Sequence, residues 1–202
     1  MKITLALLGI IFFSFLLQAV IPGYTELFYL DSAHVQIWQF VTSIFLHGGL
    51  THIIFNSYAL FLFGTILEAR LGQKNYLILF FIAGIAGNIL YYATTLVGII
   101  PPLPALGASG AIFGIFGALV VTDPNLRLLL FFIIPLKIRD AAILWFILEF
   151  FGAFNAGSGV ASAAHLGGMV VGYLIAKMYY KPRMSHEMYD WRMYQKNYHG
   201  PP

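Results

Sequence analysis

Apolar residues fall into six runs along the chain, separated by connections that carry most of the charged residues. The runs cover residues 3–21, 51–67, 76–97, 109–122, 141–154 and 164–179. Several of them approach the roughly 20 residues that an α-helix needs to cross a bilayer. The fourth and fifth runs are shorter, which suits helices that begin below the membrane surface and border a cavity. The pattern therefore predicts an all-α, multi-pass membrane protein with six transmembrane helices.

The composition agrees with a membrane protein, because 60% of the 202 residues are hydrophobic and only 9% are charged. A soluble domain has about 25% charged residues. The first run follows Lys2 as a secretory signal would, but no small-x-small cleavage site follows it, so a transmembrane helix is favoured. The chain has no cysteine, which excludes a disulfide, a thiolate zinc site and a cysteine nucleophile.

Lysine and arginine residues gather at alternate connections. They precede the first run, lie between the second and third and between the fourth and fifth, and follow the sixth, whereas residues 22–50, 98–108 and 155–163 contain none. This asymmetry predicts that both termini are cytoplasmic. The apolar stretch 126–136 is too short to span and contains a proline, so we interpret it as interfacial or re-entrant. The expected organisation is a membrane core over 1–180 and a polar cytoplasmic tail over 181–202.

Unusual polar residues gather at the outer ends of three runs. His52 and Asn56 lie on the second, Ser109 begins the fourth, and His165 lies at the start of the sixth. Polar groups of this kind within a membrane are functional candidates. Serine and histidine together form the minimal nucleophile and base for acyl transfer, so the first hypothesis is peptide-bond hydrolysis within the bilayer.

Small residues form a stripe on the fourth run and another on the sixth. Generic helix packing explains such stripes by themselves. Because Ser109 and His165 sit at their outer ends, close packing is also expected to bring the hydroxyl to the imidazole. Phe113 lies one turn below Ser109 and is expected to stack on His165. The two stripes are Gly107, Gly110, Gly114 and Gly117, and Ala164, Gly168, Gly172 and Ala176.

His52 and Asn56 are four residues apart, so they share a helix face, and both side chains can donate hydrogen bonds to a developing oxyanion. His47 is five residues before His52, off that face, and is expected to be structural and to order the Gly48–Gly49 turn. The histidines form no His-Glu-x-x-His pattern and have no carboxylate beside them in the sequence, so we expect no metal.

No carboxylate has an obvious place behind His165 in the sequence. Glu149 is the nearest candidate, but a gating or structural role is favoured for it, so the expectation is a Ser–His dyad rather than a triad. The fifth run, which contains Glu149, is rich in aromatic rings. Phe146 and Phe150 share a face that Phe55 can meet, which makes this run the expected lateral gate, while plain lipid-facing aromatics are the alternative.

Three motifs, His47 to Asn56, Gly107 to Gly110 and Ala164 to Gly168 with Gly172, closely resemble those of the rhomboid intramembrane serine proteases. The resemblance covers residues 3–180. It extends to Gly64, Glu68 and Gly72 on the second run and to Gly87 and Asn88 on the third. One departure is Trp38-Gln39, where many members of that family have Trp-Arg, and this puts the contacts of the first loop with lipid in doubt.

The resemblance implies that Ser109 is the nucleophile and His165 the general base, with an oxyanion hole formed by the Ser109 N–H, His52 and Asn56. It implies transmembrane protein substrates with small residues at the cut site, cleavage near the outer face and no cofactor. Two other functions are alternatives to the protease. A catalytically inactive client-binding relative typically lacks the serine or histidine, and a small transporter or channel is expected to show an inverted repeat, which is not seen.

Overall fold

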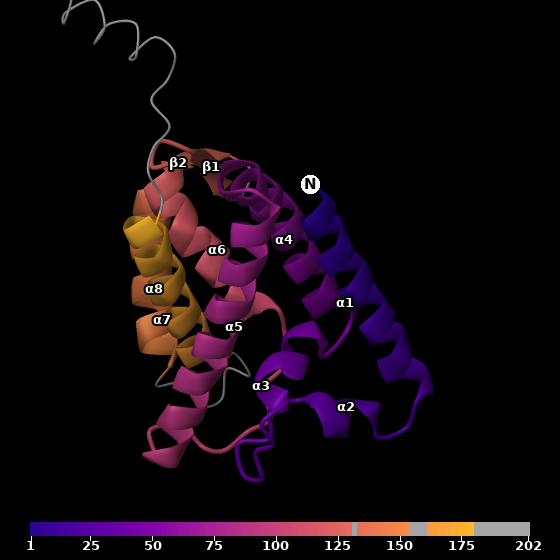
Figure 1. The fold of residues 1–202 in the computed structure, drawn as a ribbon. Coiled ribbons are helices and arrows are strands. Elements are labelled where there is room, and N and C mark those ends of the chain that lie inside the picture. The colour runs from indigo at the N-terminus through magenta and orange to yellow at the C-terminus, as the bar shows by residue number, and fades with distance from the viewer. Residues whose placement is uncertain (131–132, 154–160, 180–202) are drawn as a thin grey trace, which may run out of the picture.

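The computed structural model describes residues 1–130, 133–153 and 161–179, so the tail predicted over 181–202 lies outside the described residues. A helix occupies each of the predicted apolar runs (Figure 1). Three of these helices are long and apolar enough to cross a membrane, and a shorter apolar helix follows them. The six are α1 (Lys2–Val20), α4 (Leu50–Leu71), α5 (Gln73–Leu96), α6 (Ser109–Thr122), α7 (Ile138–Gly152) and α8 (Ser162–Tyr179).

The connection between α1 and α4 contains short helices of its own, namely α2 (Tyr24–Phe28), α3 (Gln39–Thr42) and the 3₁₀ helix η1 (Ser43–Phe45). The buried side chain of Gln39 accepts hydrogen bonds from the backbone N–H groups of Asp31 (3.2 Å) and Gln36 (3.0 Å). Asn88 of α5 donates to the Phe40 carbonyl oxygen (2.8 Å) and to Ser43 Oγ (3.0 Å). Gln39, which stands where many members of the resembled family have arginine, thus holds the backbone in the interior of this connection.

The segment between α6 and α7 is an antiparallel hairpin of β1 (Arg127–Leu130) and β2 (Ile134–Lys137), with Arg127 opposite Lys137. The all-α prediction is to this extent wrong. Pro135 has no N–H and clashes with the preceding turn of a helix, so this apolar stretch pairs as an edge strand instead. The predicted interfacial position of the stretch stays a prediction.

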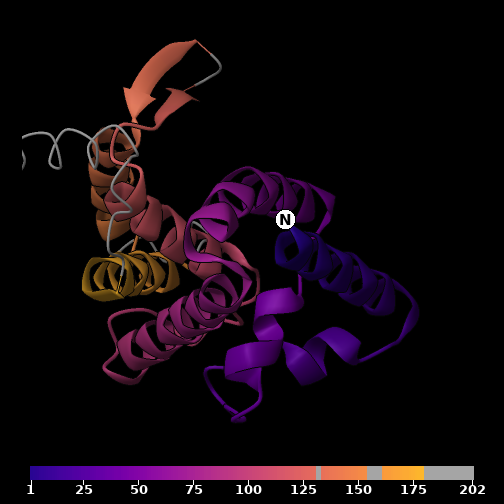
Figure 2. The same cartoon turned by 45° about the horizontal axis from the view of Figure 1, so that its top comes forward.

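The helix ends alternate between the two ends of the bundle. The N-terminus and the hairpin lie at one end, and α2 and α3 lie at the other (Figures 1 and 2). Gly72 makes the sharp turn between α4 and α5, with a φ of 77° that favours glycine. Among the described residues, the cation-bearing N-terminus, α4–α5 turn and hairpin therefore lie at the same end of the bundle, as their alternation along the sequence predicts.

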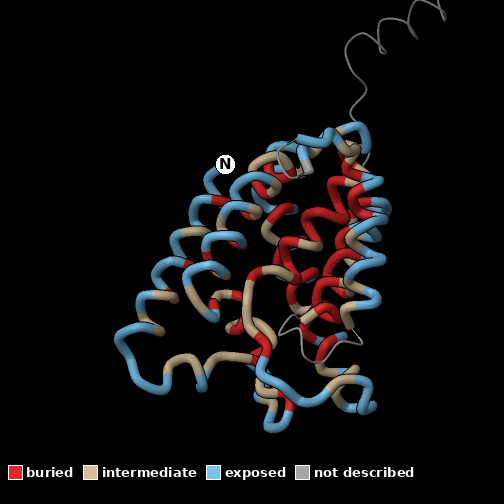
Figure 3. The backbone as a smooth tube through the Cα atoms, turned by 180° about the vertical axis from the view of Figure 1, so that it is seen from behind, coloured by how far each residue is buried: buried red, intermediate tan, exposed pale blue. Residues whose placement is uncertain are grey.

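The buried core is centred on α6, which packs closely against α5 and α8 (Figure 3). A Cβ atom on Gly168 would overlap the backbone of Gly110, and one on Gly172 would overlap the backbone of Gly114. Only glycine allows α6 and α8 to approach this closely. The predicted contact between the two small-residue stripes is confirmed for these pairs. Gly117 faces the backbone of Met169 in the same way.

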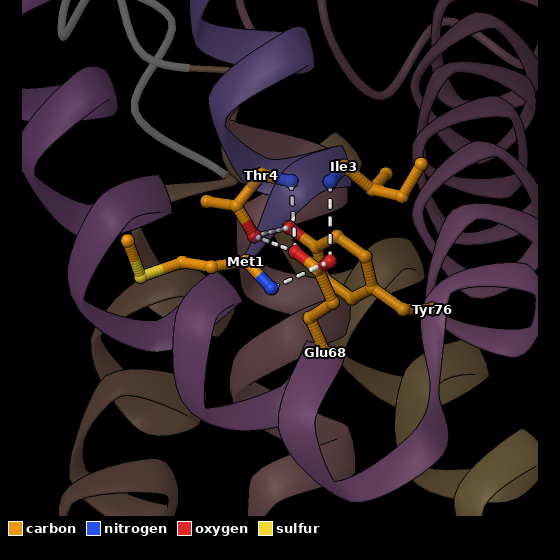
Figure 4. A network of polar contacts seen from close by, with 5 residues as sticks. All are labelled: Met1, Ile3, Thr4, Glu68 and Tyr76. Carbon is orange, nitrogen blue, oxygen red and sulfur yellow. Dashed lines mark hydrogen bonds and ion pairs between the residues drawn. The ribbon is translucent and has the colours of Figure 1, made fainter.

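A polar network joins α1, α4 and α5 at the end of the bundle that holds the N-terminus (Figure 4). The carboxylate of Glu68 accepts hydrogen bonds from the N–H groups of Ile3 (3.1 Å) and Thr4 (2.9 Å) and from the Thr4 hydroxyl (2.8 Å). The Met1 amino nitrogen is 2.8 Å from the same carboxylate. The first N–H groups of a helix have no partner within it, so Glu68 caps α1 and fixes it against α4.

Candidate active site

Ser109 is the first residue of α6, and the turn before it depends on Gly107. Gly107 has a φ of 129°, and its N–H donates to the Ser43 carbonyl oxygen at 2.9 Å. A Cβ on Gly107 would lie 2.8 Å from His52 Nε2. Gly107 therefore lies outside the stripe that packs on α8, and the prediction that it belongs to that stripe is wrong. It precedes the helix, and its lack of a side chain leaves room for the His52 ring.

The Ser109 hydroxyl meets the His165 imidazole as the facing stripes predict. His165 lies in the first turn of α8 and is 7% exposed, and its Nε2 is 2.7 Å from Ser109 Oγ. Phe113 stacks on the imidazole with a centroid distance of 4.4 Å and an interplanar angle of 11°. The expected stacking of Phe113 is thus present. One face of the ring is held by Phe113, and one edge points at the serine oxygen.

The other ring nitrogen of His165 faces a carboxylate from α7. Glu149 Oε1 is 3.0 Å from Nδ1, and the side chains are 9% exposed for His165 and 13% exposed for Glu149. This position differs from the expectation of a Ser–His dyad with no carboxylate behind His165. One signal was available, since Glu149 is the only acidic residue between 141 and 179, and a lone charge in an apolar run is a functional candidate.

His52 and Asn56 are linked to each other on α4 and line the same cavity as Ser109. The Gly48 N–H donates to His52 Nδ1 at 3.3 Å, so the neutral ring carries its proton on Nε2. Asn56 Nδ2 donates to the His52 carbonyl oxygen at 3.0 Å, which uses one of its two amide hydrogens. Within the described part of the chain, an Nε2–H and a second amide N–H are thus left for a ligand in the cavity.

His47 is buried beside the site, with 2% of its surface exposed. Its backbone N–H donates to Gln18 Oε1 at 2.9 Å, and Gln18 Nε2 donates back to the His47 carbonyl oxygen at 3.2 Å. Its ring meets that of His52 edge to face at 5.0 Å. Burial, together with the nearby His52, lowers the pKa of His47 to about 4, so the ring is neutral at physiological pH. These contacts tie α1 to the turn before α4.

The cavity that contains these groups has a volume of about 670 Å³. Polar side chains of Ser109, His165, His52 and Asn56 share its lining with apolar residues from the connection before α6. A cavity of this size accommodates several residues of an extended peptide. Among the described residues, no group of three or more His, Asp or Glu side chains is placed to hold a metal ion.

The three rings of the expected gate are all exposed. Phe55 lines the cavity and is 69% exposed, while Phe146 and Phe150 on α7 are 38% and 48% exposed. Trp145 points inward instead and meets Phe116 edge to face at 5.9 Å. A gating role for Phe55, Phe146 and Phe150 stays a prediction.

Apolar helices, among them α4 and α5 of membrane-spanning length, line a cavity in which a serine oxygen lies 2.7 Å from a histidine nitrogen. These features define a multi-pass membrane protein with polar groups in its interior. A family model described as a rhomboid domain matches residues 34–182. The chain therefore belongs to the rhomboid family.

Three relatives illustrate the similarity. The rhomboid protease GluP of Bacillus subtilis (strain 168) is 33% identical over 139 residues, which is 69% of this chain and 25% of GluP. The putative rhomboid protease YdcA of the same strain is 44% identical over 90 residues, covering 44% of this chain and 42% of YdcA. The rhomboid protease GlpG of Yersinia pestis (strain Pestoides F) is 29% identical over 154 residues, covering 73% and 50%. The chain thus spans between a quarter and a half of the length of these relatives.

Proposed function

We propose that this chain is an intramembrane serine endopeptidase that cleaves transmembrane proteins. The observation that carries the proposal is the 2.7 Å contact between Ser109 Oγ and His165 Nε2 inside a cavity among apolar helices. Membership of the rhomboid family supports it, because the relatives include named rhomboid proteases.

In the proposed reaction, the Ser109 hydroxyl attacks the scissile carbonyl carbon while His165 Nε2 accepts its proton. The tetrahedral oxyanion is stabilised by the Ser109 N–H, which has no partner within the first turn of α6, and by donors from His52 and Asn56. The imidazolium then protonates the leaving amine. Water, activated by the same imidazole, hydrolyses the acyl-enzyme and restores Ser109.

The substrate side of the proposal follows from helix geometry. A transmembrane helix hides its carbonyl groups in hydrogen bonds to N–H groups four residues away, so the cut segment must unwind to reach Ser109. Substrates with small residues at the cut site and helix-destabilising residues beyond it meet this requirement. They would enter laterally past Phe55, Phe146 and Phe150. No cofactor is needed for these steps.

We further propose that all six of the longer helices cross the membrane, that both termini are cytoplasmic and that Ser109 lies toward the outer face. The core is residues 1–180, followed by a cytoplasmic tail over 181–202. The grouping of the cation-bearing connections supports this orientation. Single cysteines introduced at Pro102 and Lys181 test it, since the chain has no native cysteine. Labelling from outside at position 102 alone is expected, and labelling from outside at position 181 alone would reverse the topology.

Incubation of the purified, detergent-solubilised protein with a model transmembrane substrate tests the activity. Cleavage by the wild-type protein and none by Ser109→Ala is the expected result. Equal cleavage by Ser109→Ala would remove the proposed mechanism. A folded wild-type protein that binds such substrates without cutting them would favour the inactive client-binding alternative, and selective solute flux in vesicles would favour the transporter or channel.

A further inference from the structure

Glu149 is a carboxylate on a helix whose neighbouring residues are largely apolar. Its side chain is 13% exposed, and it directs Oε1 toward His165 Nδ1 at 3.0 Å. The hydroxyl of Ser162, at the start of α8, also favours the charged form of this carboxylate. Removing a carboxylate from water is unfavourable unless it is paired, so its placement here needs a partner that gains from its charge.

The contact differs from a linear hydrogen bond. Oε1 is within hydrogen-bond distance of Nδ1, but it lies off the direction in which the ring N–H points. The neutral imidazole is therefore only loosely held from this side, while Phe113 fixes its plane. A positive charge on the ring would strengthen the attraction at once, because the interaction between opposite charges increases steeply in a site of low dielectric constant.

We propose that Glu149 is a positioning residue for His165, a role that rests on the proposed function. It favours the tautomer with the proton on Nδ1, which leaves Nε2 free to accept the proton of the Ser109 hydroxyl. When that proton moves from Ser109 Oγ to Nε2, the imidazolium forms beside an anionic carboxylate. The proton on Nδ1 stays on the ring and Glu149 stays ionised throughout, so the proton count balances.

Two ionisable side chains in the described part of the chain face His165, namely Glu149 on α7 and His52 on α4. Their charges act in opposite directions, since Glu149 favours the imidazolium and a protonated His52 would oppose it. Replacing Glu149 with glutamine removes the favourable charge and keeps the shape. The positive ring that forms when His165 takes a proton then loses its anionic neighbour, so the acid limb of the rate profile is expected to move to lower pH.

The test follows the rate at which an alkyl fluorophosphonate labels Ser109 across a pH series, together with cleavage of a transmembrane substrate. For Glu149→Gln we expect labelling and kcat at neutral pH to fall about tenfold or more, with KM little changed. The acid limb should move to lower pH. Glu149→Asp keeps the charge and should restore most of the acid-limb position.

Asp140→Asn is the matched control, because it makes the same acid-to-amide change on an exposed residue in the first turn of α7. It should leave labelling, kcat and the acid limb as in the wild-type protein. An unchanged rate and acid limb in Glu149→Gln would overturn the proposal. A loss confined to KM or to melting temperature would do the same, and would assign Glu149 to substrate binding or packing.

Two further measurements cover a Glu149→Gln variant that does not fold and a wild-type protein that is inactive. If Glu149→Gln does not fold, Glu149→Asp decides, because a folded aspartate variant that has lost the wild-type acid limb contradicts the proposal. If wild-type Ser109 is not labelled and cuts nothing, the proposed function fails by itself. The Nδ1–H resonance of His165 in ¹⁵N-histidine-labelled protein then still tests the contact, and it should move upfield in Glu149→Gln. An unmoved resonance would reject it.

Discussion

Two carboxylates, the buried Glu68 and the half-buried Glu149, lie on different helices and have different surroundings. Glu68 receives N–H and O–H groups from α1 on both of its oxygens, and it is 2% exposed (Figure 4). Glu149 faces one imidazole nitrogen through an off-line contact, beside the cavity that holds Ser109. The first carboxylate is surrounded by fixed donors. The second faces a histidine that lines the cavity.

This difference distinguishes a polar cluster that stabilises the fold from one that is available for chemistry. A cluster whose hydrogen-bonding capacity is filled within the fold has nothing left for a substrate, and its loss is expected to appear as lost stability. The groups around Ser109 keep spare donors and acceptors, among them His52 Nε2–H and one amide hydrogen of Asn56. Loss of such a group should appear in the rate and hardly in the stability.

His165→Ala is expected to give the largest effect and to leave the fold intact. If His165 is the general base as proposed, its removal should lower kcat by about 10⁴-fold or more, as it does in serine hydrolases that lose the catalytic histidine. Single-turnover rates of the wild-type protein and of His165→Ala measure the loss of activity, and their melting curves measure whether the fold is intact. Proteolysis that survives in the variant at wild-type rate would place the chemistry elsewhere in the molecule.

Glutamine substitutions at the two carboxylates test directly whether Glu68 and Glu149 differ in role. Glu68→Gln weakens several charge-assisted hydrogen bonds at the start of α1, so we expect a loss of about 3 kcal/mol in the free energy of unfolding with kcat per folded molecule retained. Glu149→Gln should give the opposite pattern. Thermal melting in detergent and active-site-normalised kinetics are the two measurements. Similar losses of stability in both variants would mean that the filled and unfilled clusters do not differ in role.

Asn56→Ala should weaken catalysis without abolishing it. One side-chain oxyanion donor contributes roughly 3 kcal/mol, so kcat should fall about a hundredfold or more while the Ser109 N–H and His52 remain. Steady-state kinetics with a fluorogenic substrate separate kcat from KM. A change in KM with kcat intact would assign Asn56 to binding of the ground state.

The sequence predicts the parts of this site that depend on local spacing. Gly168 and Gly172 recur at helical intervals, so the close approach of α8 to α6 and the meeting of Ser109 with His165 follow from pattern alone. Six apolar runs likewise predict the helices to within a few residues at most ends.

The parts that depend on the rotation of one helix against another could not be predicted. A helix that is apolar on all sides gives no periodic signal for which of its faces turns inward. Because α7 is nearly of this kind, the approach of Glu149 to His165 cannot be predicted from the sequence. The partners of Glu68 are more than sixty residues away along the chain. The hairpin cannot be predicted either, because a short apolar run with a proline is compatible both with an interfacial segment and with two strands.

The smallest effects are expected at the exposed rings of the predicted gate on α7. Phe150 is 48% exposed and Phe146 is 38% exposed, so truncating either should cost well below the roughly 3–5 kcal/mol of a buried aromatic ring. If opening of this side limits turnover, Phe150→Ala and Phe146→Ala should cleave a transmembrane substrate equally fast or a few-fold faster.

A soluble peptide substrate and a neighbouring ring separate gating from general loosening of α7. A peptide that reaches Ser109 from the aqueous side does not pass the gate, so its cleavage should be unchanged in Phe150→Ala. Phe151 is 69% exposed and meets Phe150 edge to face at 5.6 Å, which makes Phe151→Ala a matched control with one ring fewer on the same helix. Faster cleavage of both substrate types, or slower cleavage in all of the phenylalanine variants, would argue for packing. Acceleration of the transmembrane substrate alone, in Phe146→Ala and Phe150→Ala but not in Phe151→Ala, would place the entry route between α4 and α7.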